Sequence, residues 1–224
     1  MSWHQYWTPI YFFNKAKRLL YQWTHPGYPW LTPHAINLLS KLLKSDYVGF
    51  EFGSGRSTIW FSSRVRSLTS IEHDPIWYKR ISDKLKKDKI TNVDCHLVTE
   101  DCDEADGRDA EYVKTIGRFS DGSLDFALVD GVYRSACACA ILDKIKPGGL
   151  VIIDNANWYL PSSSISPTSR KIEEGPLSPG WSEFLAKVGT WKYTWTSNGL
   201  TDTALYIKPE HSGAAFISAD SRSR

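Results

Sequence analysis

The chain has 224 residues, of which 42% are hydrophobic, so it is long enough for one domain with a sizeable core. Its formal net charge of +2 excludes the large basic excess of a typical nucleic-acid-binding protein, whose affinity comes mainly from neutralising phosphates. It contains no apolar run long enough to span a membrane, no signal-peptide pattern, and no metal-ligand spacing among Cys95, Cys102, Cys137 and Cys139. We therefore expect a cytoplasmic protein with reduced thiols and no nucleic-acid partner.

Residues 1–33 form an aromatic N-terminal arm. The first thirty residues contain ten aromatic residues, with Lys15, Lys17 and Arg18 among them. In three interpretations these rings contact protein: they pack on the main domain, cover the substrate pocket, or form a homodimer surface. No residue pattern requires a dimer. A fourth places the arm in a membrane interface as a peripheral contact, because amphipathic aromatic residues beside cations favour that region.

From residue 34 onward, strand and helix patterns alternate. Period-2 or continuous apolar runs predict strands over residues 47–52, 67–74, 92–98, 123–131 and 150–155. Apolar residues at helical spacing predict helices over residues 34–44, from near Ser57, from Pro75 after the capping Asp74, from near Ala138 to Pro147, and over residues 182–188. Repeated strand–helix units of this length favour parallel pairing, so we expect an α/β sheet with helices on both faces.

Acidic residues follow five of these strands. They are Glu51, Glu72, Asp101, Asp130 and Asp154. Each alone is typical of a helix cap or a surface position, but ligands in open parallel sheets bind at the carboxyl ends of the strands. Five acids at that edge therefore indicate a binding site.

The loop after the first strand contains Gly53 and Gly55. It lacks the lysine of a phosphate-binding P-loop, and Thr58 stands where a dinucleotide-binding loop has its third glycine. Glu72 lies 19 residues after Gly53, a spacing that suits an acid binding ribose hydroxyls. These features favour an adenosine ligand with little or no phosphate.

Glu51 distinguishes further between cofactors. Its charge would repel a pyrophosphate but would attract an ammonium or a sulfonium. S-adenosylmethionine carries both of these groups, and its carboxylate suits the helix N-terminus at Ser57 and Thr58. It fits these residues better than NAD does.

Taken together, these motifs resemble the class I, Rossmann-like S-adenosylmethionine-dependent methyltransferases over residues 34–208. The resemblance rests on the order and spacing of FEFGSGRST, SIEHDPIWY, LDFALVDG and LDKIKPGGLVIIDN. It implies a three-layer sandwich whose mostly parallel seven-stranded sheet ends in two strands within residues 191–209, the last of them antiparallel. It also implies a cofactor site at Glu51, Gly53, Ser54, Gly55, Ser57, Thr58, Glu72, His73, Asp101 and Asp130, with Asp101 or Glu100 near the adenine.

Asp130 is the first catalytic candidate, because positioning the acceptor and removing its proton supply most of the chemistry. Resemblance to the catechol and caffeoyl-CoA type of O-methyltransferase implies a Mg²⁺ site at Asp130, Asp154 and Asn155. In an alternative interpretation these residues position substrate or end strands. Arg134 is a second catalytic candidate that would grip a substrate carboxylate or phosphate, or would instead pair with an acid in residues 101–106.

Substrate contacts are expected from the least regular segments. Residues 157–181 have the composition of a lid loop, and residues 209–224 that of a disordered tail. Candidate substrate residues, each with core packing as the alternative, are Tyr28, Trp30, His34, Tyr133, Asn155, Trp158 and Tyr159.

Three functional hypotheses remain open. The first is methyl transfer to a small molecule, at oxygen. The second is aminopropyl transfer on the same fold. The third is a non-catalytic protein that keeps the nucleoside pocket as structure and docks a partner or a membrane through its arm.

Overall fold

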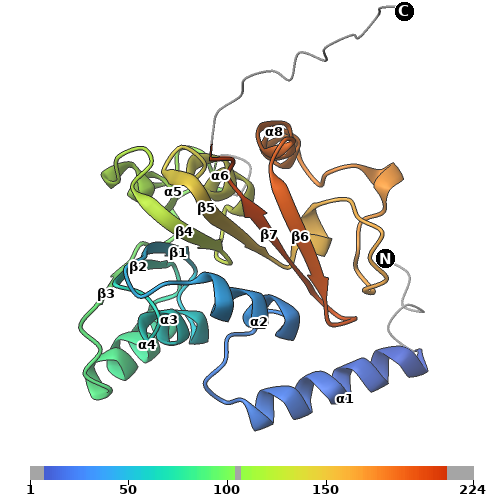
Figure 1. Ribbon diagram of the computed structural model, residues 1–224, viewed down its shortest axis with the longest axis horizontal. Helices are drawn as coiled ribbons and strands as arrows, with labels where there is room; N and C mark the ends of the chain where they lie inside the picture. Colours follow the sequence, from blue (N-terminus) through green and yellow to red (C-terminus); the bar gives the residue numbers. More distant parts are fainter. Residues whose placement is uncertain (1–7, 104–106, 211–224) are drawn as a thin grey trace, which may run out of the picture.

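The structure is a computed structural model that describes residues 8–103 and 107–210. Its centre is a seven-stranded sheet in the order β3-β2-β1-β4-β5-β7-β6 (Figure 1). Strands β1 to β5 pair in parallel, whereas β7 is antiparallel to both of its neighbours. The strands are β1 (Val48–Phe52), β2 (Ser67–Glu72), β3 (Val93–Leu97), β4 (Leu124–Val129), β5 (Ile145–Asp154), β6 (Lys192–Ser197) and β7 (Asp202–Ile207). The predicted Rossmann-like sandwich is confirmed, including the antiparallel last strand.

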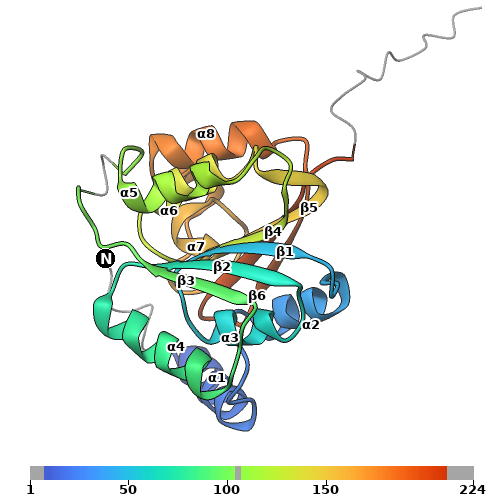
Figure 2. The ribbon, with the colours of Figure 1, turned by 90° about the vertical axis from the view of Figure 1, so that its left-hand side faces the viewer.

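Helices cover both faces of the sheet, as Figure 2 shows. One face carries α2 (Pro33–Leu42), α3 (Arg56–Ser62) and α4 (Pro75–Lys87), with α1 (Pro9–Thr24) outside them. The other carries α5 (Glu111–Lys114), η3 (Thr115–Arg118), α6 (Arg134–Ala140), α7 (Ala156–Tyr159) and α8 (Pro179–Val188). A further 3-10 helix, η4 (Ile172–Glu174), interrupts the segment before α8.

Two hydrophobic cores lie on the two faces of the sheet, and the alternation of side chains along each strand separates them. In β5, Val151 and Ile153 join the core under α6 and α8, while Leu150 and Ile152 join the core under α2 and α3. All four are buried, which explains why this strand reads as one continuous apolar run.

Helix α6 is shorter than the sequence predicts. It ends at Ala140, and the chain turns before β5 begins at Ile145, so Lys146 pairs with Asp125 from within a strand. The apolar spacing predicted a longer helix because Ile141 and Leu142 are buried. They are buried here in a turn.

Capping residues set where two other helices begin. α8 begins at Pro179 rather than near Ser182, because Ser178 caps it. α2 likewise begins at Pro33, after Thr32, whose hydroxyl accepts from the amide of Ala35.

Several sequence expectations fall at the ends of the chain. Residues 1–7 of the arm, and the expected disordered tail from residue 211 onward, lie outside the described residues. Within residues 8–103 and 107–210, no helix combines the length and hydrophobicity that crossing a bilayer requires. The four cysteines are free thiols.

Gly49 in β1 leaves room for an aromatic ring of β4. A Cβ at Gly49 would lie 2.1 Å from the ring of Phe126, a fully buried residue opposite it in β4. We predict that Gly49→Ala lowers the free energy of unfolding by about 1–3 kcal/mol, because the ring has no free space to enter. Urea unfolding measures this, with Gly117→Ala as control, since a Cβ there meets nothing within 4 Å. Equal stability of the two variants would contradict the prediction.

Candidate functional site

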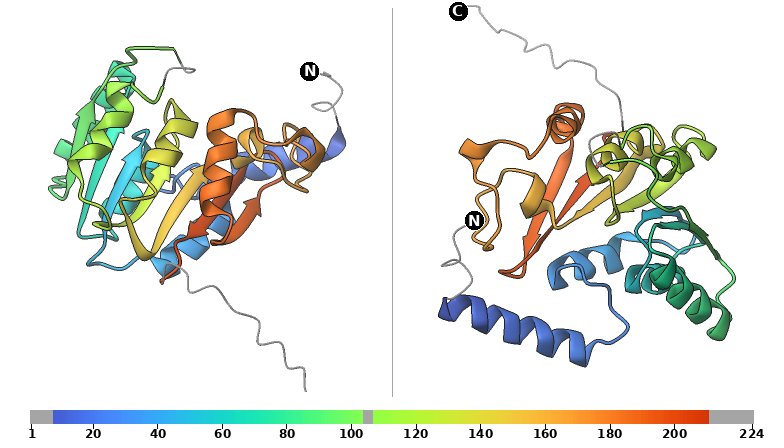
Figure 3. Two further views of the ribbon diagram at one scale, coloured as in Figure 1. Left: turned by 90° about the horizontal axis from the view of Figure 1, so that it is seen from above. Right: turned by 180° about the vertical axis from the view of Figure 1, so that it is seen from behind.

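A cavity of about 360 Å³ lies at the carboxyl ends of β1, β2 and β4. Strand order reverses between β1 and β4, so this is the crevice where open α/β sheets bind their ligands. Its walls come from the glycine loop (residues 53–55), the first turn of α3, the β2–α4 connection and the start of the β4–α6 loop. Figure 3 shows these elements from above and from behind.

Two glycines hold the glycine loop against the β4–α6 loop. Gly53 has φ +94°, and a Cβ there would lie 2.7 Å from the amide nitrogen of Gly131. A Cβ on Gly131 would lie 2.0 Å from the hydroxyl oxygen of Tyr112. Neither position tolerates a side chain, so the backbone itself forms this part of the wall.

Each amide of the glycine loop already has a partner. Gly53 donates to the carbonyl of Ile71 at 2.8 Å. Ser54 donates to Glu72 Oε2 and Gly55 to Thr58 Oγ1, both at 2.8 Å. A phosphate-binding loop needs such amides for the anion. This loop is therefore unsuited to a pyrophosphate.

Glu72 presents a fixed carboxylate to the cavity. Besides the bond from Ser54, its Oε1 accepts from the amides of His73 at 2.8 Å and Asp74 at 2.9 Å. The side chain is only 3% exposed, yet it lines the cavity together with His73. A carboxylate held in one orientation, with accepting capacity left on Oε2, suits a ribose hydroxyl.

Glu51 lies behind the cavity wall rather than in it. It is fully buried, and its Oε2 accepts from Thr58 Oγ1 at 2.6 Å and Ser70 Oγ at 2.8 Å. Burial raises the pKa of Glu51 to about 7, although hydrogen bonds from Ser57, Thr58 and Ser70 oppose the shift. Among the described residues, Oε1 has no hydrogen-bond partner. Glu51 thus fixes the first turn of α3 beneath the loop.

Four cavity residues were missed by the sequence analysis as ligand contacts: Arg56, Asp74, Trp77 and Gly131. Trp77 Nε1 donates to the carbonyl of Ser54 at 2.5 Å, and its ring lies 6.0 Å from that of Trp30. The Arg56 guanidinium lies 5.5 Å from the Trp30 ring, and its Nη1 is buried without a hydrogen-bond partner in the described part of the chain. The signal was available, because Arg56 directly follows the second glycine and Trp77 lies in the first turn after Glu72.

Arg134 fills the space between the ends of β4 and β5. Its Nη2 donates to both the carbonyl and Oδ1 of Asp130, its Nη1 to the carbonyl of Asp154 and to Asn155 Oδ1, and its Nε to the carbonyl of Gly131, at 2.7–3.2 Å. These bonds use all of its N–H donors. The predicted role of Arg134 in gripping a substrate anion is therefore not supported, and among the described residues its ion partner is Asp130. Residues 104–106 of the predicted acidic partner segment lie outside the described residues.

Asp154 is buried and turned away from the cavity. Its Oδ1 accepts from Thr203 Oγ1 on β7 at 2.9 Å. Burial, and then the nearby charge of Asp130, raise the pKa of Asp154 to about 8. Burial also raises the pKa of Asp130, against the opposing effect of Arg134. Asp130 itself remains 32% exposed and lines the cavity.

The implied Mg²⁺ site does not fit these residues. A divalent cation needs open, ionised oxygen ligands. Here a guanidinium already binds Asp130 and Asn155, and Asp154 Oδ1 accepts a hydrogen bond from Thr203. Within the described ranges, no group of three His, Cys, Asp or Glu side chains is arranged to hold a metal.

Asp101 and Glu100 are exposed and line no part of this cavity. Asp101 Oδ2 accepts from the amide of Glu111 at the start of α5, so it acts as a helix cap. Glu100 Oε1 lies 3.8 Å from His73 Nε2. The sequence pattern located the strand end correctly but not the direction of its side chain.

A second cavity, of about 740 Å³, adjoins the first at Gly131. Two predicted substrate residues, Tyr133 and Tyr159, line it together with Leu177 and Trp181. Tyr159 stacks on Trp181 at 5.2 Å and lies 5.5 Å from the Arg134 guanidinium.

The remaining substrate candidates lie elsewhere. Trp30 lines the first cavity, whereas Tyr28 lines a separate one with Asn92, at the amino ends of the strands. His34 and Trp158 are exposed and line none of these cavities.

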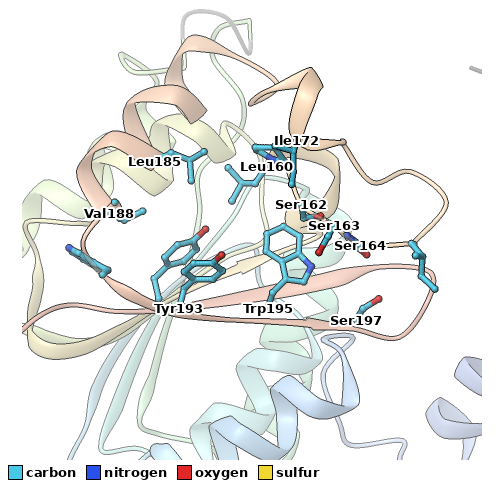
Figure 4. Close-up of a pocket in the computed structure, with 15 residues that line it drawn as sticks. Leu160, Ser162, Ser163, Ser164, Ile172, Leu185, Val188, Tyr193, Trp195 and Ser197 are labelled. Carbon is cyan, nitrogen blue, oxygen red and sulfur yellow. Dashed lines mark hydrogen bonds between the residues drawn. The ribbon is translucent and has the colours of Figure 1, made fainter.

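An apolar cavity of about 600 Å³ was not foreseen from the sequence. Figure 4 shows Tyr193 and Trp195 from β6 beneath Leu185 and Val188 from α8, with the serines of residues 162–164 at one side. It shares no lining residue with the glycine-loop cavity, so the two cavities are separate.

Known proteins share this architecture without close sequence similarity. No protein-family model and no curated protein sequence matches the chain. A methyltransferase-like protein from Silicibacter pomeroyi is similar in structure, with a TM-score of 0.55 and 18% identity over 81% of this chain and 89% of that one. A protein assigned as a caffeoyl-CoA O-methyltransferase from Staphylococcus aureus has a TM-score of 0.55 and 15% identity over 87% and 91%. A protein assigned as a methyltransferase from Streptococcus mutans, in complex with SAH, has a TM-score of 0.51. It is 13% identical over 79% of this chain and 98% of that one.

The chain has the Rossmann-like fold of the class I S-adenosylmethionine-dependent methyltransferases. At these identities the similarity concerns the fold. Within this methyltransferase fold, the glycine loop and Glu72 lie at the switch point of the sheet, where the sequence motifs predicted them.

The raised pKa of Asp154 makes stability depend on pH. The folded state keeps this proton up to about pH 8, whereas the unfolded chain releases it near pH 4, so the free energy of unfolding falls between these values. The Asp154→Asn side chain can still accept from Thr203 but binds no such proton. We predict that its free energy of unfolding, relative to that of the parent, rises by about 1–3 kcal/mol between pH 5 and pH 8. Urea unfolding at both values tests this, with the exposed Asp143→Asn as control. A gain that does not change with pH would contradict it.

Proposed function

We propose that this protein is an S-adenosylmethionine-dependent methyltransferase that methylates a small molecule at a hydroxyl oxygen. One observation carries the proposal: the Glu72 carboxylate lines a cavity beside a glycine loop whose amides are all engaged. Such a site accepts a ribose and gives no cradle to a pyrophosphate, which favours a nucleoside with a cationic group over a dinucleotide.

The residues present fit this cofactor. Glu72 would bind a ribose hydroxyl, and Arg56, with a buried donor atom that has no partner among the described residues, would bind the carboxylate of the methionine part. Asp130 at the rim would favour the cationic end. When bound, the cofactor supplies an electrophilic methyl group.

Asp130 is the proposed base. It lies in the wall next to Gly131, where the cofactor cavity and the larger cavity adjoin, and Arg134 fixes its orientation. An acceptor hydroxyl in the larger cavity would donate its proton toward Asp130 as the oxygen attacks. The raised pKa of Asp130 brings it closer to the neutral range, where a base works best.

The larger cavity suits a small acceptor with an aromatic or apolar part. Tyr159 and Trp181 offer stacked rings, and Arg108 offers a cation at the same wall. The proposed oxygen acceptor rests on Asp130, which can take the proton of a hydroxyl held in this cavity. The fixed guanidinium of Arg134 would provide the positive charge at the ends of β4 and β5, so the proposed reaction needs no divalent metal.

Cofactor binding tests the first part of the proposal. We expect S-adenosylmethionine and S-adenosylhomocysteine to bind the parent protein in calorimetric titration, and Glu72→Gln to weaken both by about ten- to a hundredfold, since a charged hydrogen-bond acceptor is lost. The exposed Glu111→Gln should bind like the parent. Thermal unfolding confirms that each variant is folded. Binding of NAD in place of the sulfur nucleosides would refute the assignment.

Activity tests the second part. Against a panel of hydroxylated aromatic acceptors, at saturating cofactor, we expect Asp130→Asn to lower kcat by about 10²–10⁴-fold. Asp121→Asn, at an exposed site paired with Lys144, should not change kcat. EDTA should leave the parent rate unchanged. A rate that disappears with EDTA and returns with Mg²⁺ would show that a metal, not Arg134, supplies the charge.

A further inference from the structure

The N-terminal part of the chain has a charge balance unlike the rest. Its first 45 residues contain five of the 27 Lys and Arg residues and no Asp or Glu. Three of these cations, Lys15, Lys17 and Arg18, lie in α1, which forms the outer edge of the molecule below α2 in Figure 1.

Helix α1 turns its more polar side toward the domain. Tyr11, Asn14, Arg18 and Tyr21, at helical spacing, are partly buried. Asn14 Nδ2 donates to the carbonyl of Gly199 in the β6–β7 turn at 3.4 Å. At the other end, Tyr21 stacks on His25 at 4.3 Å and meets Tyr28 edge-on. These two anchors fix which side of the helix faces outward.

The outward side is apolar. Six large apolar side chains of α1 are 50–79% exposed. Ile10 lies apart in the first turn, and the outward side consists of Phe12, Phe13, Leu19, Leu20 and Trp23. At the angular step of an α-helix they occupy an arc of about 120°. No residue of α1 is buried. The helix is therefore inverted relative to an ordinary surface helix, whose apolar side packs on the core.

Cations border this apolar arc. Lys15 and Lys17 fall on its two sides, where long side chains can place their ammonium groups at the level of lipid headgroups. A second copy of the chain is a poorer partner, because α1 packed on α1 would bring cations together with no acidic residue in the first 45 to balance them. An anionic surface with an apolar interior complements both features.

We propose that α1 is an interfacial anchor that lies on anionic lipid membranes, with its apolar side at the boundary of headgroups and acyl chains. Lys15 and Lys17 contact lipid phosphates, and the anchors at Asn14 and Tyr21 hold the domain to the membrane-bound helix. This inference does not depend on the proposed methyl transfer.

Co-sedimentation of the full chain with vesicles tests the anchor. We expect binding to vesicles that contain phosphatidylglycerol, weaker binding to phosphatidylcholine alone, and a loss of binding at high salt. Phe13→Ser with Leu20→Ser should weaken binding at least tenfold, because both side chains are exposed and lose only their lipid contact. Ile76→Ser, at an equally exposed apolar residue of α4, should bind like the parent.

A charge variant separates the two contributions. Lys15→Glu with Lys17→Glu should abolish the preference for phosphatidylglycerol while leaving thermal stability unchanged. Three results would overturn the proposal: no binding of the parent to anionic vesicles at low salt, equal binding by the Phe13→Ser, Leu20→Ser variant, or a dimer in sedimentation velocity that this variant dissociates while vesicles do not bind. The last result would assign the apolar side to a protein interface.

Discussion

The close approach of the backbone at Gly53 to the backbone at Gly131 is the constraint on which the candidate site depends. It locks the loop after β1 against the loop after β4, so that the wall of the cavity is main chain rather than side chain. The amides of residues 53–55 then turn to Ile71, Glu72 and Thr58, which fixes the Glu72 carboxylate in the wall. The site is thus formed before a ligand arrives, which reduces the ordering that binding requires.

The acidic edge of the sheet carries less charge than its residues suggest. Asp101 caps α5, Glu51 lies behind the wall, and Asp154 is protonated near neutral pH. Asp130 is neutralised by the Arg134 guanidinium, and Glu72 is bound by backbone amides. An edge that is acidic in sequence therefore becomes a site of modest charge, in which each carboxyl group has a different role.

The parts of the site that sequence could predict are those fixed by backbone geometry. A cavity at the switch point is predicted by two glycines after a buried strand and an acid after the next strand. This prediction does not depend on contacts with other elements. Side-chain direction is different, because it depends on contacts between distant elements. Arg134 binds the ends of β4 and β5, and Asp154 turns to Thr203 on β7. The end of α6 was missed for a related reason: burial of Ile141 and Leu142 does not distinguish a helix from a turn.

The raised pKa values of the buried Glu51 and Asp154 affect the enthalpy of unfolding. Near neutral pH Asp154 is mostly protonated and Glu51 is about half protonated in the folded protein, and both release protons when the chain unfolds. The buffer takes up those protons with its own enthalpy. The calorimetric enthalpy of unfolding therefore contains a buffer contribution, and it differs between Tris and phosphate at the same pH although the protein passes between the same two states.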